Sequence, residues 1–290
     1  FYFNMGVLYI NNNGNLLPNS SPTIDPGNRA HLYGDGVFET IRIVSGKPIN
    51  VENHIARLIE GAKVLRIRVP SYYNAEFFQE RIEELILKSR IEKGGKCRLS
   101  IDRSIGGTYL PTSNEANFYI EVDAYGSNFF ELNAKGLEVD IYQDIKLQKN
   151  FLSNFKTKSC LHYVMAAIAA KEKGLDDLFL SNDKGNILET SSSNVFVVSN
   201  GVLYTPGLEE GCLAGTMRMQ IINLALAAGI KVYECSILPQ NLLAADEVFI
   251  TNAIKGVNWI GGYRTKTFSN AIARKLIIAL NESWRKSIEK

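Results

Sequence analysis

The chain has 290 residues, 46% hydrophobic and 21% charged, a composition typical of a folded protein long enough for two domains. A net charge of +2, with no five-residue run of like charge, gives no reason to expect nucleic acid or a membrane as partner. The apolar stretches are too short to span a membrane, and the first ten residues lack the pattern of a signal peptide. The four cysteines form no C-x-x-C pair and the three histidines have no ligand spacing, so we expect a cytoplasmic protein without a metal site.

The N-terminal part predicts a small α+β domain. Residues 6–10 and 15–17 flank Asn11–Gly14, which is a hairpin signal. A strand over residues 37–43 follows a Gly-Asp-Gly turn. Apolar spacing then predicts helices over 51–65 and 75–93, the second ended by Gly94-Gly95, and two alternating strands at 97–103 and 116–122. We expect this domain over residues 1–123, a linker over 124–133 and a larger domain over 134–290.

The larger domain opens with the strand LEVDIY and a helix that Gly174 ends. The helix carries one apolar face, made of Leu161, Val164, Met165, Ile168 and Ala169. An apolar strand at 178–180 then turns through 182–186 into a second strand that carries Glu189. The dipeptide Asn200-Gly201 between two apolar strands is the clearest hairpin signal in the chain. A helix from Gly215 to Gly229, the strand DEVFITN and an amphipathic helix over 269–290 complete the domain.

Two charged residues of this domain stand in an unusual setting. Lys156 lies at the entry to a helix, and Glu189 lies on a strand that is otherwise apolar. Pyridoxal phosphate needs an amine for its aldehyde, an acid for its ring nitrogen and a cradle for its phosphate. Lys156 and Glu189 could supply the first two. On residue types alone, the simpler explanation is a solvated helix-end lysine and a strand-edge carboxylate.

Longer strings carry a family resemblance. The segments YGDGVFETIR, at residues 33–42, and ETSSSNVF, at 189–196, resemble motifs of the class IV aminotransferases, which are fold-type IV pyridoxal-phosphate enzymes. Counted back from Gly174, Lys156 falls where the D-amino-acid branch of that family carries its cofactor-binding lysine, whereas Lys158 does not. The resemblance implies an α+β fold, with a small α/β domain followed by a larger domain that has a β-barrel-like core flanked by helices. It also implies pyridoxal 5'-phosphate as cofactor, a small amino-group substrate and a homodimer.

The resemblance assigns the phosphate to several elements. The H-x-x-R-L element at residues 54–58 would supply Arg57, whose planar fork suits a phosphate, although a surface arginine would show the same spacing. The helix start at Gly215, Thr216 and Met217 would bind the same anion through its backbone N–H groups and its dipole, unless it is an ordinary glycine-initiated helix. Thr251 and Asn252, in the last family motif, would lie nearby.

The reaction is left between two choices. Lys156 would act as the general base, and Thr40, where branched-chain enzymes tend to have glycine and D-amino-acid enzymes valine, could relay a proton as in the family's 4-amino-4-deoxychorismate lyases. Against a lyase, the arginine of that group's R-G-Y string is Thr108 here, which leaves Arg98 or Arg103, with Phe38, to contact the substrate. We place the lyase first, an amino-acid aminotransferase of branched-chain or D-amino-acid type second, and a non-catalytic cofactor-binding homologue third.

Overall fold

The protein is described by a computed structural model that covers residues 8–288. It divides into two compact units, each of which is taken separately below. The first runs up to Phe129 and also contains Phe155–Ser159; the second contains Phe130–Asn154 and the chain from Cys160 onward. The division at 129/130 lies inside the predicted linker, but nothing in the sequence indicated that residues 155–159 return to the first unit.

The first unit is built on a six-stranded antiparallel sheet with the order β2-β1-β6-β5-β3-β4. Its strands are β1 Tyr9–Asn12, β2 Asn15–Pro18, β3 Gly36–Val44, β4 Lys47–Pro48, β5 Gly95–Arg103 and β6 Ala116–Ala124. Its helices are α1 Arg29–Tyr33, α2 Val51–Val64 and α3 Ala75–Lys88. The hairpin predicted at Asn13-Gly14 is confirmed, although residues 6 and 7 of its first predicted strand lie outside the described part of the chain.

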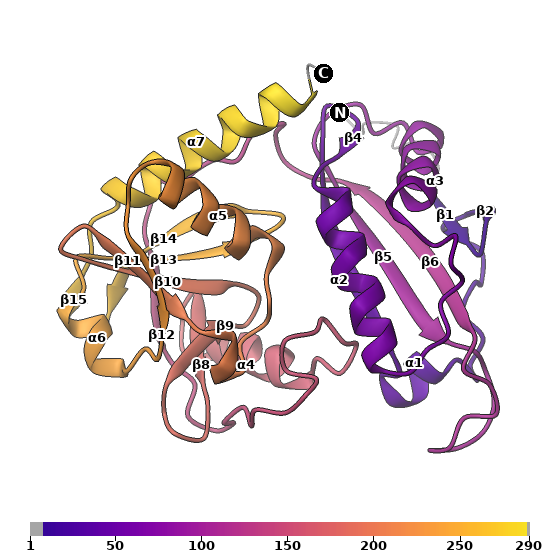
Figure 1. Cartoon of the computed structure of the whole chain (residues 1–290), viewed down its shortest axis with the longest axis horizontal. Helices are drawn as coiled ribbons and strands as arrows, with labels where there is room; N and C mark the ends of the chain where they lie inside the picture. Colours follow the sequence, from indigo (N-terminus) through magenta and orange to yellow (C-terminus); the bar gives the residue numbers. More distant parts are fainter. Residues whose placement is uncertain (1–7, 289–290) are drawn as a thin grey trace. The chain divides into compact units, whose positions relative to one another are not determined.

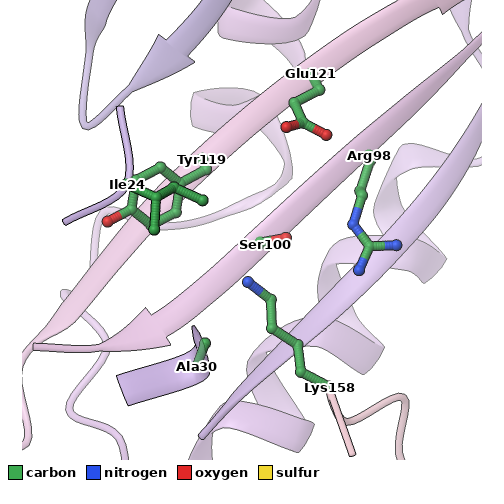
Figure 2. A pocket seen from close by; sticks show the side chains of 7 residues that line it. All are labelled: Ile24, Ala30, Arg98, Ser100, Tyr119, Glu121 and Lys158. Carbon is green, nitrogen blue, oxygen red and sulfur yellow. The ribbon is translucent and has the colours of Figure 1, made fainter. Parts of the chain in front are cut away.

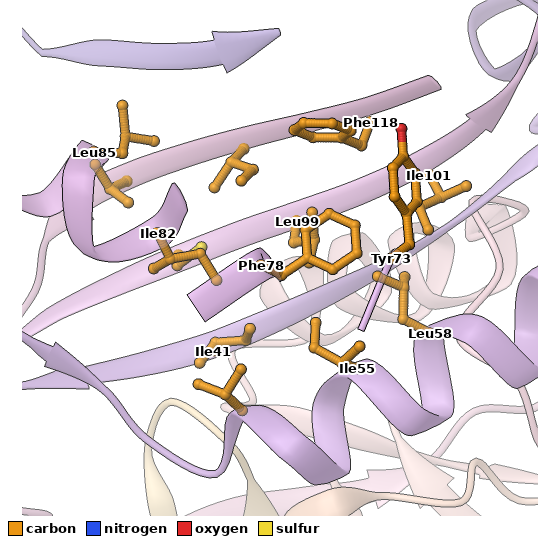
Figure 3. Packing of buried hydrophobic residues seen from close by; sticks show 14 of the residues in the cluster. Ile41, Ile55, Leu58, Tyr73, Phe78, Ile82, Leu85, Leu99, Ile101 and Phe118 are labelled. Atoms are coloured by element: carbon orange, nitrogen blue, oxygen red, sulfur yellow. The ribbon is translucent and has the colours of Figure 1, made fainter. Parts of the chain in front are cut away.

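Alternation along the strands gives this sheet one apolar and one polar face. On β3 the side chains of Val37, Ile41 and Ile43 enter the core, where α2 and α3 pack on them through residues such as Leu58 and Phe78 (Figure 3). The even-numbered residues of β3, including Phe38 and Thr40, lie on the opposite face, which those two helices leave uncovered.

The second helix of this unit is shorter than predicted. α3 ends at Lys88 instead of Lys93. Arg90 adopts a positive φ of 55°, and the amides of Arg90 and Ile91 bond back to Leu87 and Ile86, which closes the helix before the glycines are reached.

The second unit is built on a closed barrel, as predicted. Strand β10 pairs with both β9 and β13, so six strands form a ring in the order β10-β13-β14-β7-β8-β9. They are β7 Leu137–Ile141, β8 Asp177–Ser181, β9 Ile187–Thr190, β10 Asn194–Ser199, β13 Glu247–Asn252 and β14 Gly256–Tyr263. Strands β11 Val202–Pro206, β12 Val232–Cys235 and β15 Lys266–Thr267 extend the sheet. The predicted hairpin between β10 and β11 is confirmed, with Asn200 and Gly201 both at positive φ.

Helices flank this barrel (Figure 1). They are α4 Leu161–Glu172, the short 3₁₀ helix η1 Leu208–Glu210, α5 Thr216–Ala227, α6 Pro239–Ala244 and α7 Ala271–Ile288. Within residues 8–288 no helix combines the length and the apolar character needed to cross a membrane.

The face of helix α4 that packs on the barrel differs from the apolar face that the sequence predicts. Ala166 and Ala170 pack on Leu178 and Leu180 of the barrel. Four of the five residues predicted for the apolar face are exposed instead. Leu161 is 77% exposed and Val164, Met165 and Ile168 are 44–48% exposed, whereas Ala169 is partly buried against the same cluster.

Candidate active site

The segment that carries Lys156 is attached to the edge of β3. The amide of Phe38 donates to the Lys156 carbonyl at 3.0 Å, and the amide of Lys158 donates to the Gly36 carbonyl at 2.9 Å. Val37 and Thr157 form an antiparallel bridge between these bonds. Residues 156–158 therefore continue the sheet as a short extended strand, and Lys156 and Lys158 project to the same side of it.

The predicted substrate residues Phe38 and Arg98 lie together with Lys156. The Lys156 Nζ is 4.4 Å from the centre of the Phe38 ring, and the Arg98 Cζ is 3.8 Å from it. Thr40 is the direct register partner of Arg98, so its half-buried side chain lies on the same face of the sheet. One face of the first unit thus brings together an amine, a guanidinium, an aromatic ring and a hydroxyl.

The predicted phosphate ligand Arg57 is held by a buried carboxylate. Its Nε and Nη2 donate to the two oxygens of Glu39, each at 2.6 Å, and His54 Nδ1 lies 2.6 Å from the same carboxylate. Burial acts to raise the pKa of Glu39, but the charges of Arg57 and His54 outweigh it and lower that pKa to about 2. Glu39 therefore remains ionised at neutral pH and fixes the orientation of the guanidinium.

The other predicted substrate arginine, Arg103, is engaged inside the fold. It donates from Nε and Nη2 to Asp35, and from Nη1 and Nη2 to the carbonyls of Arg66 and Leu65. Nη1 also contacts the Asn114 side chain. Since Arg103 is only 7% exposed and these five contacts match its five N–H groups, its structural role is to tie the end of α2 to the sheet.

A cavity of about 310 Å³ lies on the polar face of this sheet (Figure 2). Its polar lining consists of Arg98, Ser100, Tyr119, Glu121 and Lys158, and apolar contacts come from Ile24 and Ala30. Because Arg98 also contacts the Phe38 ring that Lys156 covers, the cavity adjoins the amine.

In the second unit, three polar side chains stand in a row across neighbouring strands. Asn194 of β10 is the register partner of Glu189 on β9 and of Thr251 on β13. Directly paired residues point to the same face of a sheet, so the three side chains lie side by side. All three are buried, with exposures of 3% for Glu189, 5% for Asn194 and 1% for Thr251.

The carboxylate of Glu189 accepts hydrogen bonds from neighbouring elements. Tyr163 of α4 donates its hydroxyl to Oε1 at 2.6 Å, and the backbone N–H of Leu213 donates to Oε2 at 3.0 Å. Burial and the adjacent carboxylate both raise the pKa of Tyr163, so it remains a protonated donor. These bonds fix the position of the carboxylate.

Helix α5 begins beside the same row. Gly215 is its N-cap, and a Cβ at this position would lie 1.9 Å from Asn194 Oδ1. Asn194 also donates from Nδ2 to the Leu213 carbonyl at 2.8 Å. The glycine is therefore required by the close approach of the Asn194 side chain, which sets where the first turn, with Thr216 and Met217, begins.

The two predicted residues of the last motif differ in their surroundings. The hydroxyl of Thr251 is buried and has no hydrogen-bond partner among residues 8–288. Asn252, in contrast, accepts from the amides of Ile254 and Lys255 and donates to Ser193 Oγ at 2.9 Å. Its side chain holds the turn between β13 and β14.

These groups fit pyridoxal phosphate. The chain carries a partly buried amine, a buried and oriented carboxylate, a helix that starts at a glycine, and a buried hydroxyl with no hydrogen-bond partner among residues 8–288. No cluster of metal-ligating side chains occurs in the part of the chain that the structure describes.

Sequence reasoning missed two residues beside the buried carboxylate of the second unit. Asn194 was visible only as one letter of the ETSSSNVF string, and its place between Glu189 and Thr251 depends on strand pairing. Tyr163 was passed over as part of a helix, although a tyrosine among small apolar residues at a helix start was an available signal.

Comparisons with known proteins identify the family of the chain. The family model described as amino-transferase class IV matches residues 36–260. The chain is 30% identical over 251 residues to a D-alanine aminotransferase of Bacillus licheniformis, covering 86% of this chain and 84% of that one. It is 29% identical over 255 residues to an aminodeoxychorismate lyase of Bacillus subtilis, covering 86% and 83%. The crystal structure of a branched-chain aminotransferase from Thermoproteus uzoniensis superposes with a TM-score of 0.87 at 25% identity, covering 97% and 94%.

Proposed function

Since the chain belongs to the class IV aminotransferase family, and is therefore a pyridoxal-phosphate enzyme, we propose that it is a 4-amino-4-deoxychorismate lyase, which releases pyruvate and forms 4-aminobenzoate. The observation that carries this proposal is the hydroxyl of Thr40. It stands in register with Arg98, on the face where the Lys156 amine lies against the Phe38 ring. An elimination needs a proton carrier at the departing group, and a threonine can serve where glycine or valine cannot.

The chain's own residues divide the work. Pyridoxal phosphate, when bound, supplies an aldehyde for an amine and a ring that accepts electrons from the neighbouring carbon. Lys156 Nζ takes the proton from the carbon that bears the substrate amine, and the Thr40 hydroxyl delivers a proton to the released enolpyruvyl group.

The remaining residues bind and orient. Glu189 stabilises the protonated ring nitrogen by its opposite charge. Arg57, the start of α5 and the Thr251 hydroxyl hold the phosphate. Arg98 contacts a substrate carboxylate; it is preferred to Arg103, whose donors are used inside the fold.

An amino-acid aminotransferase is the second candidate. Its specific support is the 30% identity to a D-alanine aminotransferase. Both reactions begin with the same proton abstraction, and only the lyase reaction then releases a leaving group. An assay with each type of substrate therefore distinguishes the two.

The decisive assay offers purified, pyridoxal-phosphate-loaded enzyme 4-amino-4-deoxychorismate in one arm. The other arm contains an amino acid with a 2-oxo acid. We expect 4-aminobenzoate and pyruvate in equal amounts in the first arm and little exchange in the second. Amino exchange without pyruvate release would establish the aminotransferase instead, and a loaded enzyme inactive in both arms would favour a non-catalytic homologue.

Thr40→Val tests the role of the hydroxyl, because valine keeps the β-branched shape. We expect kcat for the lyase reaction to fall about 100-fold, within the range of general acid–base catalysis. Thr40→Ser is the matched control and should retain most of the activity. Equal activity of the valine variant and the native enzyme would show that the Thr40 hydroxyl has no role in the reaction, and the main support for a lyase would be lost.

We also propose that the chain forms a homodimer, as the family resemblance implies. The exposed apolar face of α4, made of Leu161, Val164, Met165 and Ile168, supports an interface, since such patches mark interaction sites. Light scattering should give twice the mass of the chain, and Met165→Glu should lower it. A native monomer at micromolar concentration would contradict the proposal.

A further inference from the structure

Lys158 is the second cation of the cavity on the first unit's sheet. Its ammonium lies 2.5 Å from Asp102 Oδ1, and its side chain is 16% exposed. Asp102 is 1% exposed and lies outside the cavity lining, so the carboxylate holds the ammonium from the protein side. The Asp102 carboxylate thus restricts the orientation of the Lys158 ammonium, unlike that of an unpaired surface lysine.

Asp102 is itself fixed by its neighbours. Asn28, which caps the start of α1 with its side-chain oxygen, donates from Nδ2 to Asp102 Oδ2 at 3.1 Å. On the other side β3 passes so close that a Cβ at Gly36 would lie 2.6 Å from Asp102 Oδ1. The carboxylate therefore has little freedom, and the ammonium that it orients has little as well.

The ammonium retains binding capacity toward the cavity. An ammonium has three N–H groups, and Asp102 occupies one side of it. Figure 2 shows the Lys158 nitrogen pointing into the cavity toward Ser100, with the Arg98 guanidinium also turned to this space. A largely buried ion pair becomes favourable only when further acceptors satisfy its remaining protons.

The donors of the lining favour an anion as that acceptor. Arg98 and Lys158 are the cations that line the cavity, Glu121 is its carboxylate, and Asp102 pairs with Lys158 from outside the lining. Ser100 and Tyr119 add hydroxyl groups that can donate to the same ligand. A single bound carboxylate could accept hydrogen bonds from several of these donors.

The two lysines leave the same side of the backbone two residues apart. Lys156 and Lys158 project to the same side of an extended segment. Two residues of such a segment span about 6.6 Å. This separation suits a ligand with an amine and a carboxylate on opposite corners of a six-membered ring.

We propose that Lys158, oriented by Asp102, binds the ring carboxylate of the substrate and selects cyclic amines that carry a carboxylate para to the amine. This inference rests on the proposed function, because the lyase substrate belongs to that class. In this assignment Lys158 determines specificity and Asp102 is a positioning residue.

The first test measures inhibitor binding to the pyridoxal-phosphate-loaded wild-type enzyme. 4-Aminobenzoate is compared with 4-aminobenzamide, which has the same shape without the charge. We expect the carboxylate to bind at least tenfold more tightly. Equal affinity for the two compounds would overturn the inference, and this arm requires no variant to fold.

The second test assigns the preference to Lys158. Lys158→Met keeps the length of the side chain and removes the charge; it should abolish the preference for 4-aminobenzoate and raise the KM for 4-amino-4-deoxychorismate at least tenfold, with a smaller change in kcat. Lys158→Arg should restore the preference. Lys63→Met, at an exposed lysine of α2, is the matched control and should change neither value. An unchanged preference in Lys158→Met overturns the inference.

The outcomes separate this inference from the proposed function. A wild-type enzyme that releases no pyruvate, but prefers the carboxylate through Lys158, refutes the lyase and retains the carboxylate site. An active lyase in which Lys158→Met behaves as wild type retains the lyase and refutes the site.

Discussion

The two units present their reactive groups in different ways. In the first, the amine of Lys156 and the cations Arg98 and Lys158 lie on one open face of a sheet, beside a cavity. In the second, Glu189, Asn194 and Thr251 are buried side by side, and their positions are fixed by strand register. The open face suits groups that must meet a changing ligand, and the buried row suits groups that hold one cofactor in a constant position.

The largest expected effect is on the open face. Lys156→Ala removes the amine that serves as cofactor attachment and general base, so turnover should fall by about 10³-fold or more. Steady-state rates of the loaded enzyme measure this. Thermal unfolding should change little, because Lys156 is only partly buried. If the variant kept more than a tenth of native turnover, Lys156 would not be the catalytic lysine.

The first unit also contains a buried charge cluster, in which Glu39 binds Arg57 and His54. Breaking it should reduce stability. Glu39→Gln leaves Arg57 without its carboxylate and should lower the free energy of unfolding by about 3–5 kcal/mol. Glu60→Gln, in the exposed Glu60–Lys63 pair of α2, the helix that carries Arg57, is the control. It should change the free energy of unfolding by less than about 1 kcal/mol.

The pH dependence of the Glu39 contribution follows from its depressed pKa. The folded pKa of about 2 lies below the ordinary 4.5, so the carboxylate stabilises the fold above pH 4.5 and its contribution disappears as the pH falls toward 2. Denaturant unfolding between these values should show the decline in the native protein and a flatter profile in Glu39→Gln. Parallel profiles would contradict the assigned cluster.

In the buried row, Glu189→Gln should reduce kcat about 100-fold, because the charge that stabilises the protonated ring nitrogen is lost. Tyr163→Phe keeps the carboxylate and removes one of its hydrogen bonds, so its loss should be nearer tenfold. If the phenylalanine variant were the more damaged of the two, the charge of Glu189 would not be the group that matters.

The smallest effect concerns the start of α5. Gly215→Ala places a methyl group against Asn194 and should lower stability by about 1–3 kcal/mol and weaken cofactor binding. Thermal unfolding and cofactor titration measure the two losses. The double variant with Asn194→Ala removes the clash, so the combined loss should be smaller than the sum of the single losses; strict additivity would show that the two side chains do not meet.

Much of the fold could be predicted from the sequence, because local patterns determine it. The hairpins at Asn13-Gly14 and Asn200-Gly201 follow from turn chemistry, and the two faces of β3 follow from alternation. The family, the barrel and the cofactor were predicted from motif strings and are confirmed.

What remained hidden depends on contacts between distant segments. The apolar spacing of α4 identifies a face but does not show whether this chain covers it, and the barrel meets Ala166 and Ala170 instead. Arg98 and Arg103 look alike in the sequence, yet only the structure shows that Asp35 and three backbone or amide oxygens occupy Arg103. The attachment of residues 156–158 to β3 likewise has no local signal.

The central claim, that Lys156 is the amine that captures the cofactor, is tested most directly by borohydride reduction of the loaded enzyme followed by peptide mapping. Because Lys158 lies two residues away and projects to the same side, fragment ions must distinguish the two positions. We predict that the reduced pyridoxyl group is found on Lys156. A group on Lys158, or on no lysine at all, would contradict the account.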